Sequence, residues 1–179
     1  IRLAAHGSRV TIDQRLEKLA AADQDDLEPL RYTIWNVTQI RYPEQTLYPL
    51  NPHSALEGGL HLFNWGDTDK AMAEQKKVVA ANVKIEDGIG IFKPHPVKAQ
   101  KTGADSDRWL AGIVGQTAIA EFFRRDGTQM YPDGGLSAEV YTCDRYTELE
   151  LLSPWVHLEI GETLDFTIEW ELYAIPEQA

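Results

Sequence analysis

Two glutamates near the C-terminal end of the sequence have a spacing that suits acid–base chemistry. Glu148 and Glu150 lie in residues 146–150 (YTELE), which the residue pattern predicts to be a β-strand. On a strand the two side chains point to the same face, roughly 7 Å apart. Carboxylates this close raise each other's pKa when they are shielded from water, so one of them can act as a general base. The alternative is a solvated strand face, because Glu169 and Glu171 repeat the same spacing.

Aromatic residues are the second chemical signal, since the sequence contains 5 Trp and 7 Tyr. Sugars stack their C–H faces on aromatic rings while carboxylates and amides hydrogen-bond their hydroxyl groups. An acidic cleft with Trp or Tyr walls would therefore suit a neutral polyol. The alternative is that most tryptophans fill a hydrophobic core. Judged by their own segments alone, Trp35 and Trp170 are expected to be core residues.

Most motifs of known catalytic sites are absent from the sequence. It has no P-loop, no GxGxxG after a strand, no HExxH and no GxSxG. The five histidines include no helical i, i+4 pair, and His53 and His61 are not spaced as metal ligands. The single Cys143 excludes an internal disulfide and a cysteine-based zinc site. We therefore expect neither a metal nor a cofactor.

Composition limits the classes of partner. The 179 residues include 17 Lys and Arg against 28 Asp and Glu, which gives a formal net charge of −11. A phosphate backbone requires a basic footprint, so nucleic acid is not an expected partner. No apolar stretch approaches the roughly 20 residues that span a bilayer, so no membrane partner is expected either. No signal peptide is visible, and we favour the cytoplasm over the periplasm as the compartment.

The elements that must position these residues are mainly strands. The clearest covers residues 164–172, where apolar and acidic or hydroxyl side chains alternate. Further strands are expected over residues 32–40, 60–65, 83–92 (a hairpin turning at Asp87-Gly88), 109–114, 118–124, 136–142 and 146–152. Many short strands separated by Gly, Pro or Asp favour an all-β sandwich or barrel.

Three segments depart from the strand pattern. Residues 12–22 have apolar residues at helical spacing and predict a helix. Residues 67–81 predict a second helix, with Asp67 or Thr68 as its N-cap. Residues 93–108 hold two prolines, several lysines and a glycine, and predict a long loop.

Short motifs in the sequence resemble those of galactose mutarotase-like (aldose 1-epimerase-like) proteins, and more narrowly an uncharacterised bacterial branch of that superfamily. The resemblance covers about residues 30–173, with gaps. The motifs are Trp35-Asn36-Val37-Thr38-Gln39, Tyr131-Pro132-Asp133, Ala138-Glu139-Val140-Tyr141, Tyr146-Thr147-Glu148-Leu149-Glu150, Ser153-Pro154, Leu158, Gly161-Glu162 and Trp170.

The resemblance implies a fold and a kind of ligand. The implied fold is an antiparallel β-supersandwich that binds a carbohydrate on its concave face. Residues 1–179 would form one sandwich domain, truncated at its N-terminus and belonging to the C-terminal part of a longer chain. An exposed strand edge left by missing strands would favour pairing with a second copy, so a homodimer is expected.

The resemblance also implies a mechanism. In mutarotases a glutamate on a late strand takes the proton of the anomeric hydroxyl, and a histidine protonates the ring oxygen. Glu148 or Glu150 matches the glutamate, and we favour Glu148. The strand that usually carries the histidine motif has Trp35-Asn36-Val37-Thr38 here, so His53 would have to act from a loop.

Several hypotheses therefore stand for the function. The first is a carbohydrate-binding protein with acid–base chemistry on a sugar or oligosaccharide. Its catalytic candidates are Glu148, Glu150 and His53, and its binding candidates are Trp35, Asn36, Gln39 and Asp133. The second is a non-catalytic accessory or interaction domain. The third is glycoside hydrolysis by two carboxylates, for which Glu148 and Asp133 are the pair to test.

Overall fold

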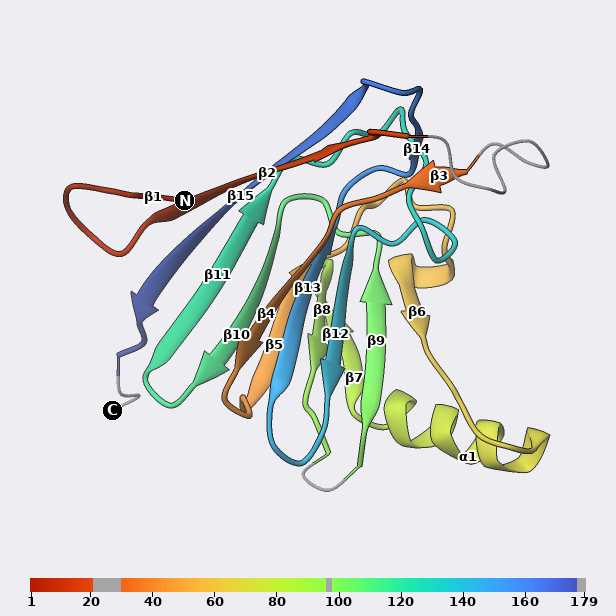
Figure 1. Ribbon diagram of the computed structural model, residues 1–179. Coiled ribbons are helices and arrows are strands. Elements are labelled where there is room, and N and C mark those ends of the chain that lie inside the picture. The colour runs from red at the N-terminus through yellow and green to blue at the C-terminus, as the bar shows by residue number, and fades with distance from the viewer. Residues whose placement is uncertain (21–29, 96–97, 177–179) are drawn as a thin grey trace.

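The computed structural model describes residues 1–20, 30–95 and 98–176, and shows two antiparallel sheets packed face to face (Figure 1). The larger sheet has the order β1 (Arg2–Leu3), β2 (Val10–Glu17), β15 (Thr163–Ala174), β11 (Thr117–Phe123), β10 (Trp109–Val114), β5 (Gln45–Pro49), β8 (Ile89–Phe92) and β7 (Val83–Glu86). The smaller sheet has the order β4 (Trp35–Ile40), β13 (Thr147–Leu152), β12 (Ala138–Thr142), β9 (Gln100–Ala104) and β6 (Leu60–Leu62). The expected all-β sandwich is confirmed.

Short elements complete the fold. Strands β3 (Arg31–Tyr32) and β14 (Val156–His157) form a separate pair at one end of the sandwich. Helix α1 (Asp69–Ala80) lies beside β6 and the start of β9 at the other end (Figure 1), and the 3₁₀ turn η1 (Glu57–Gly59) precedes β6. Thr68 caps α1, as the sequence predicts, by accepting a hydrogen bond from the backbone N–H of Ala71 at 3.2 Å.

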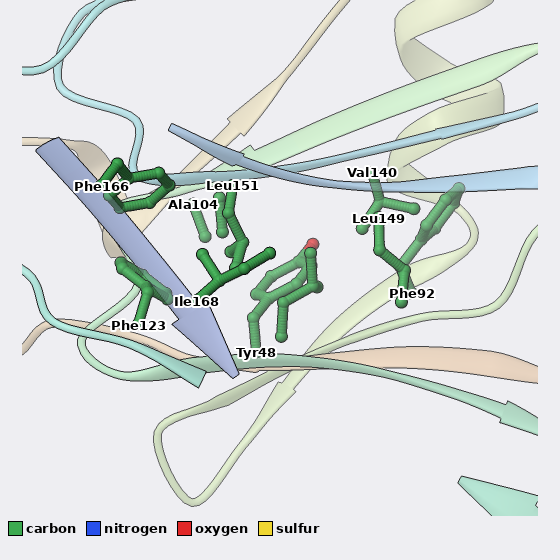
Figure 2. Close-up of a cluster of buried hydrophobic side chains, with 11 residues drawn as sticks. Tyr48, Phe92, Ala104, Phe123, Val140, Leu149, Leu151, Phe166 and Ile168 are labelled. Atoms are coloured by element: carbon green, nitrogen blue, oxygen red, sulfur yellow. The ribbon is translucent and has the colours of Figure 1, made fainter. Parts of the chain in front are cut away.

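The core fills the space between the two sheets. Side chains from both sheets meet there, and Figure 2 labels nine of them: Tyr48, Phe92, Ala104, Phe123, Val140, Leu149, Leu151, Phe166 and Ile168. The Tyr48 hydroxyl spans the sheets and donates to Thr102 Oγ1 at 3.1 Å. Gly90 lies under the Tyr48 ring, where an added Cβ would be 2.3 Å from a ring carbon, so only glycine fits. Trp170 packs against this cluster, in line with the sequence expectation.

The predicted hairpins form as expected. The turn at Asp87-Gly88 has positive φ at both residues (50° and 76°), the geometry that suits a two-residue hairpin between right-twisted strands. Strands β10, β11, β12 and β13 pair as two hairpins, and their ends lie within two residues of the predicted boundaries.

Two segment predictions are wrong. The helix expected over residues 12–22 is a strand where the structure describes it, and residues 21–22 lie outside the described ranges. Alternate side chains of β2 point into the space between the two sheets. The strand also forms eight residue pairs with β15, and this pairing outweighs the helical propensity of the segment. The long loop expected over residues 93–108 contains β9, which pairs with both β12 and β6.

Candidate functional site

The outer face of the smaller sheet is the face that points away from the larger sheet. It carries buried charged side chains beside an exposed aromatic ring. Strand side chains alternate between faces, so odd-numbered residues of β4 and β9 and the glutamates of β12 and β13 share this side. The members are Trp35, Val37 and Gln39 on β4, Glu148 and Glu150 on β13, Glu139 and Tyr141 on β12, and Lys101 on β9.

At the centre of this face is a carboxylate cluster made of Lys101, Glu139 and Glu150. Glu139 and Glu150 are direct cross-strand partners. The Lys101 ammonium donates to Glu139 Oε2 at 2.5 Å and to Glu150 Oε2 at 3.0 Å. Both carboxylate side chains are 1% exposed and the lysine side chain is 18% exposed, so the three charges are largely removed from water.

One ammonium cannot balance two buried carboxylates. Burial raises the pKa of Glu139 to about 8, because the opposing effect of Lys101 is incomplete and the charges of Glu150 and Asp133 add to the rise. Burial lowers the pKa of Lys101, but its hydrogen bonds and charge contacts with the two glutamates outweigh burial and raise that pKa above the ordinary value. Near neutral pH the cluster therefore holds a charged lysine and a protonated Glu139.

Glu139 has a free oxygen. Its Oε1 atom is buried and has no hydrogen-bond partner among the residues that the structure describes. Buried polar atoms in native proteins are almost always paired, so an orphaned carboxyl oxygen marks a place where a ligand or water completes the bonding. A carboxylic acid with a pKa near neutrality and a free oxygen is also suited to general acid catalysis.

Aromatic rings flank the cluster. The Lys101 ammonium lies 5.1 Å from the ring centroid of Trp35 and 5.1 Å from that of Phe63. The Trp35 indole N–H donates to Glu150 Oε2 at 3.0 Å. Trp35 is nevertheless 56% exposed, so the expectation that it is a core residue is wrong. It faces outward because odd-numbered residues of β4 point away from the larger sheet.

A second carboxylate–amide contact borders the cluster. Glu148 accepts a hydrogen bond from the Gln39 side-chain amide at 2.9 Å, and both side chains reach solvent. Glu148 and Glu150 share a face, as their spacing predicts, but have different surroundings. Glu150 is buried and holds Trp35 and Lys101 in place, whereas Glu148 is accessible.

The remaining predicted residues do not all join this face. Asn36 points to the opposite side of β4, where its amide donates to Gln14 Oε1 at 3.3 Å. Asp133 lies in the loop before β12 with a φ of 49°, and its charge acts on Glu139. His53 is exposed and lines a separate pocket with Arg125, so it does not occupy the place of the mutarotase histidine beside Glu148.

Residues of the outer face that sequence reasoning missed come from β6, β9 and β12. Lys101 lies in the segment that the sequence predicts to be a loop. Glu139 belongs to one of the mutarotase-like motifs, but the sequence does not identify it as a site residue. His61 also lies on this face, opposite Gly103, with its ring packed edge-on against Phe63 at 4.6 Å between centroids. The alternation of residues 138–142 is the one signal that could have placed Glu139 beside Glu150.

Two further findings concern the kind of site. Within the described ranges, no group of three or more His, Cys, Asp or Glu residues is arranged to hold a metal ion. No helix in the same part of the chain is long and apolar enough to cross a membrane.

The outer face can therefore stack a ring on the half-exposed Trp35 indole and hydrogen-bond it through the Gln39 amide and the Glu148 carboxylate, while the Glu139 carboxyl group lies buried beside them. Comparison with known proteins does not assign this arrangement to a family. The chain matches no family model, no curated protein sequence and no solved structure.

Proposed function

We propose that the outer face of the smaller sheet binds a carbohydrate. The observation that carries this proposal is Trp35, a half-exposed indole that a buried carboxylate holds in position. An ordered aromatic surface of this kind can stack on the C–H face of a pyranose with little loss of side-chain entropy on binding.

The polar groups around the indole fit a neutral polyol. Gln39 and Glu148 offer an amide and a carboxylate to hydroxyl groups, and Glu139 offers a buried oxygen without a partner. An uncharged ligand also avoids repulsion by a chain of net charge −11. The resemblance of the sequence motifs to mutarotase-like proteins supports the same class of ligand.

The arrangement of two carboxyl groups favours acid–base chemistry on the bound sugar as a second candidate function. Glu139 pairs with Glu150 and Tyr141 pairs with Glu148, so Glu139 and Glu148 are diagonal neighbours. Such neighbours lie roughly 7–8 Å apart between Cα atoms. Accessible Glu148 is suited to act as the base, and protonated Glu139, which is 1% exposed, would act as the acid after a bound ligand displaces the side chains that cover it.

The balanced reaction would be mutarotation. Glu148 takes the proton of the anomeric hydroxyl while Glu139 gives its proton to the ring oxygen, the bond from the anomeric carbon to the ring oxygen breaks, and a carbonyl forms. Reclosure on the other face of the carbonyl returns both protons. If the protein binds sugars without this activity, it is the accessory domain of the alternative hypothesis.

The binding proposal is tested by calorimetric titration with a panel of monosaccharides and oligosaccharides. Trp35→Ala is expected to weaken binding about tenfold or more, which corresponds to about 1.4 kcal/mol. Trp65→Ala is the matched control, because Trp65 is 41% exposed and does not belong to the carboxylate cluster. Equal loss in the two variants, or no binding by the wild type, would contradict the proposal.

The chemistry is tested separately by polarimetry of freshly dissolved aldoses. Glu148→Gln and Glu139→Gln are each expected to reduce the rate to that of buffer, whereas Glu17→Gln on the larger sheet is expected to retain the wild-type rate. A wild-type rate equal to that of buffer would leave sugar binding as the function and exclude mutarotation of the aldoses tested.

A further inference from the structure

A pocket separate from the outer face lies next to β14, which pairs with β3 at one end of the sandwich (Figure 1). It is a pocket of about 440 Å³, within the usual range for small-molecule sites. Its lining includes His53, Asp105, Arg125, Met130, Tyr131 and Trp155, and we refer to it as the Arg125 pocket.

Arg125 is held rigidly with part of its hydrogen-bonding capacity unused. Its Nε–H donates to Asp105 Oδ1 at 2.5 Å, and its guanidinium lies 5.2 Å from the Tyr131 ring centroid. Asp105 is fixed in turn by the Asn51 amide at 3.1 Å. The arginine side chain is 15% exposed, and neither of its Nη atoms has a hydrogen-bond partner in the described part of the chain. The outer edge of the guanidinium is thus an ordered pair of donors that the described part of the protein leaves available to a ligand.

The wall of the pocket is partly apolar. Met130 is 54% exposed and Trp155 is 40% exposed, and the Trp155 backbone N–H donates to the Met130 carbonyl at 2.7 Å. A thioether and an indole held together in this way form a surface for a ring.

A second cation lies at the rim. The Arg31 guanidinium is 5.2 Å from the Trp155 ring centroid, and its Nη1 atom donates to Met130 Sδ at 3.5 Å. Among the described residues Arg31 has no carboxylate partner, whereas Asp105 balances Arg125. Arg125 also interacts with Asp126, which has Arg124 as a further neighbour. Counting Arg31, Arg124 and Arg125 against Asp105 and Asp126 leaves one positive charge near the pocket of a strongly acidic protein.

The geometry points to a small carboxylate carried on a ring as the ligand of the Arg125 pocket. The two Nη atoms of a guanidinium match the two oxygens of a carboxylate, and the ring would lie against Met130 and Trp155. The same chemistry is found in sugar acids and in aromatic acids. This site is separate from the outer face and does not depend on the function proposed for it.

The test compares each acid with its uncharged amide by calorimetric titration. The probes are glucuronate against glucuronamide, and benzoate against benzamide. At least one acid is expected to bind about tenfold more tightly than its amide. The preferred pair identifies the ring as a sugar or an aromatic. Equal affinity within both pairs, or no binding by either acid, would overturn the inference.

Variants connect the effect to Arg125. Arg125→Lys keeps the charge opposite Asp105 but removes the two-pronged donor, and is expected to lose most of the preference for the acid. Arg108→Gln is the control, because Arg108 is a 79% exposed side chain paired with Asp107. Trp155→Ala keeps the Asp105–Arg125 pair intact and is expected to weaken both members of the preferred pair. An unchanged acid preference in folded Arg125→Lys would refute the assignment.

Discussion

Glu121 is a buried carboxyl group that faces the space between the sheets. It is fully buried, and neither of its oxygens has a hydrogen-bond partner in the described part of the chain. Burial raises its pKa to about 8, and the nearby Thr38 hydroxyl, which does not reach hydrogen-bond geometry, opposes this rise only in part. Trp170, its cross-strand neighbour, has an indole N–H that is also buried and unpartnered. Glu121 is therefore a source of pH-dependent stability inside the core.

The sign of that dependence follows from proton counting. Between pH 4.5 and about 8 the folded state keeps the Glu121 proton while the unfolded state has lost it. The folded state then binds more protons, so the free energy of unfolding falls as pH rises, with a limiting slope of about 1.4 kcal/mol per pH unit for one group. The raised pKa of Glu139 acts in the same direction.

Glu121→Gln is expected to remove one of these two contributions. The variant should resemble the wild type near pH 4.5 and be more stable by roughly 4 kcal/mol at pH 8, because the amide does not ionise. Urea unfolding across this pH range measures the difference, with Glu17→Gln as an exposed control. Parallel pH profiles for Glu121→Gln and the wild type would refute the burial argument.

At the residue scale, the alternation of side chains along a strand predicts which residues share a face, but not which of them are buried. The shared face of Glu148 and Glu150 follows from period two alone. Which of them is buried depends on Lys101 and Trp35, which come from strands distant in sequence. The sequence predicts Trp35 in the core because large aromatic residues are usually buried. It does not show that β4 presents its odd-numbered residues outward.

At the element scale, helix α1 anchors the strand that carries Lys101. The Gln75 amide donates to the Ala99 carbonyl at 2.7 Å, and the Gln100 amide donates to the Val78 carbonyl at 3.3 Å. Val79, on the helix itself, is fully buried. The start of β9 is thus held in place by one side chain and one backbone carbonyl of the helix.

Removal of the α1 cap should therefore have a measurable cost. Thr68→Ala is expected to lower the free energy of unfolding by about 1 kcal/mol, because the Ala71 N–H loses its acceptor. Thr68→Ser keeps an acceptor oxygen and should stay close to the wild type in urea denaturation. The same midpoint for both variants would show that the cap does not stabilise the cooperative unit.

Elements with strong apolar alternation could be predicted, and those with polar inner faces could not. Strand β15 has five large apolar side chains on its inner side, and it was the clearest prediction. Strand β9 presents Gln100, Thr102 and Ala104 inward, so it carries no hydrophobic period and its sequence predicts a loop. Strand β2 places Gln14 among its inward residues and has good helix formers between them, which led to the wrong element.

At the scale of the whole molecule, β4 forms an edge of the smaller sheet, pairing with β13 alone among the described strands. Val37 on this strand is 43% exposed, and the strand is six residues long. An edge of this kind can pair with another chain. The net charge of −11 on each copy opposes such pairing at low ionic strength.

If the homodimer predicted from the sequence forms through β4, the fraction of dimer should increase with salt concentration. Sedimentation velocity should show more dimer at high than at low ionic strength, and Val37→Lys should reduce it. Ile85→Lys on β7, an edge of the larger sheet, is the control, because Ile85 is similarly exposed at 49%. A monomer at every salt concentration, or the same effect from both variants, would argue against dimerisation through β4.

The pairing of β15 with β2 determines when folding can finish. Leu164 pairs with Leu16 and Trp170 with Val10, so nearly the whole sequence separates the partners. Contacts this far apart close the largest possible loop and slow folding. During synthesis β2 emerges well before β15 and, among the described strands, has only β1 beside it until residues 163–174 leave the ribosome. Until then the inward side of β2, with Ile12 and Leu16, is exposed to chaperones and to other nascent chains.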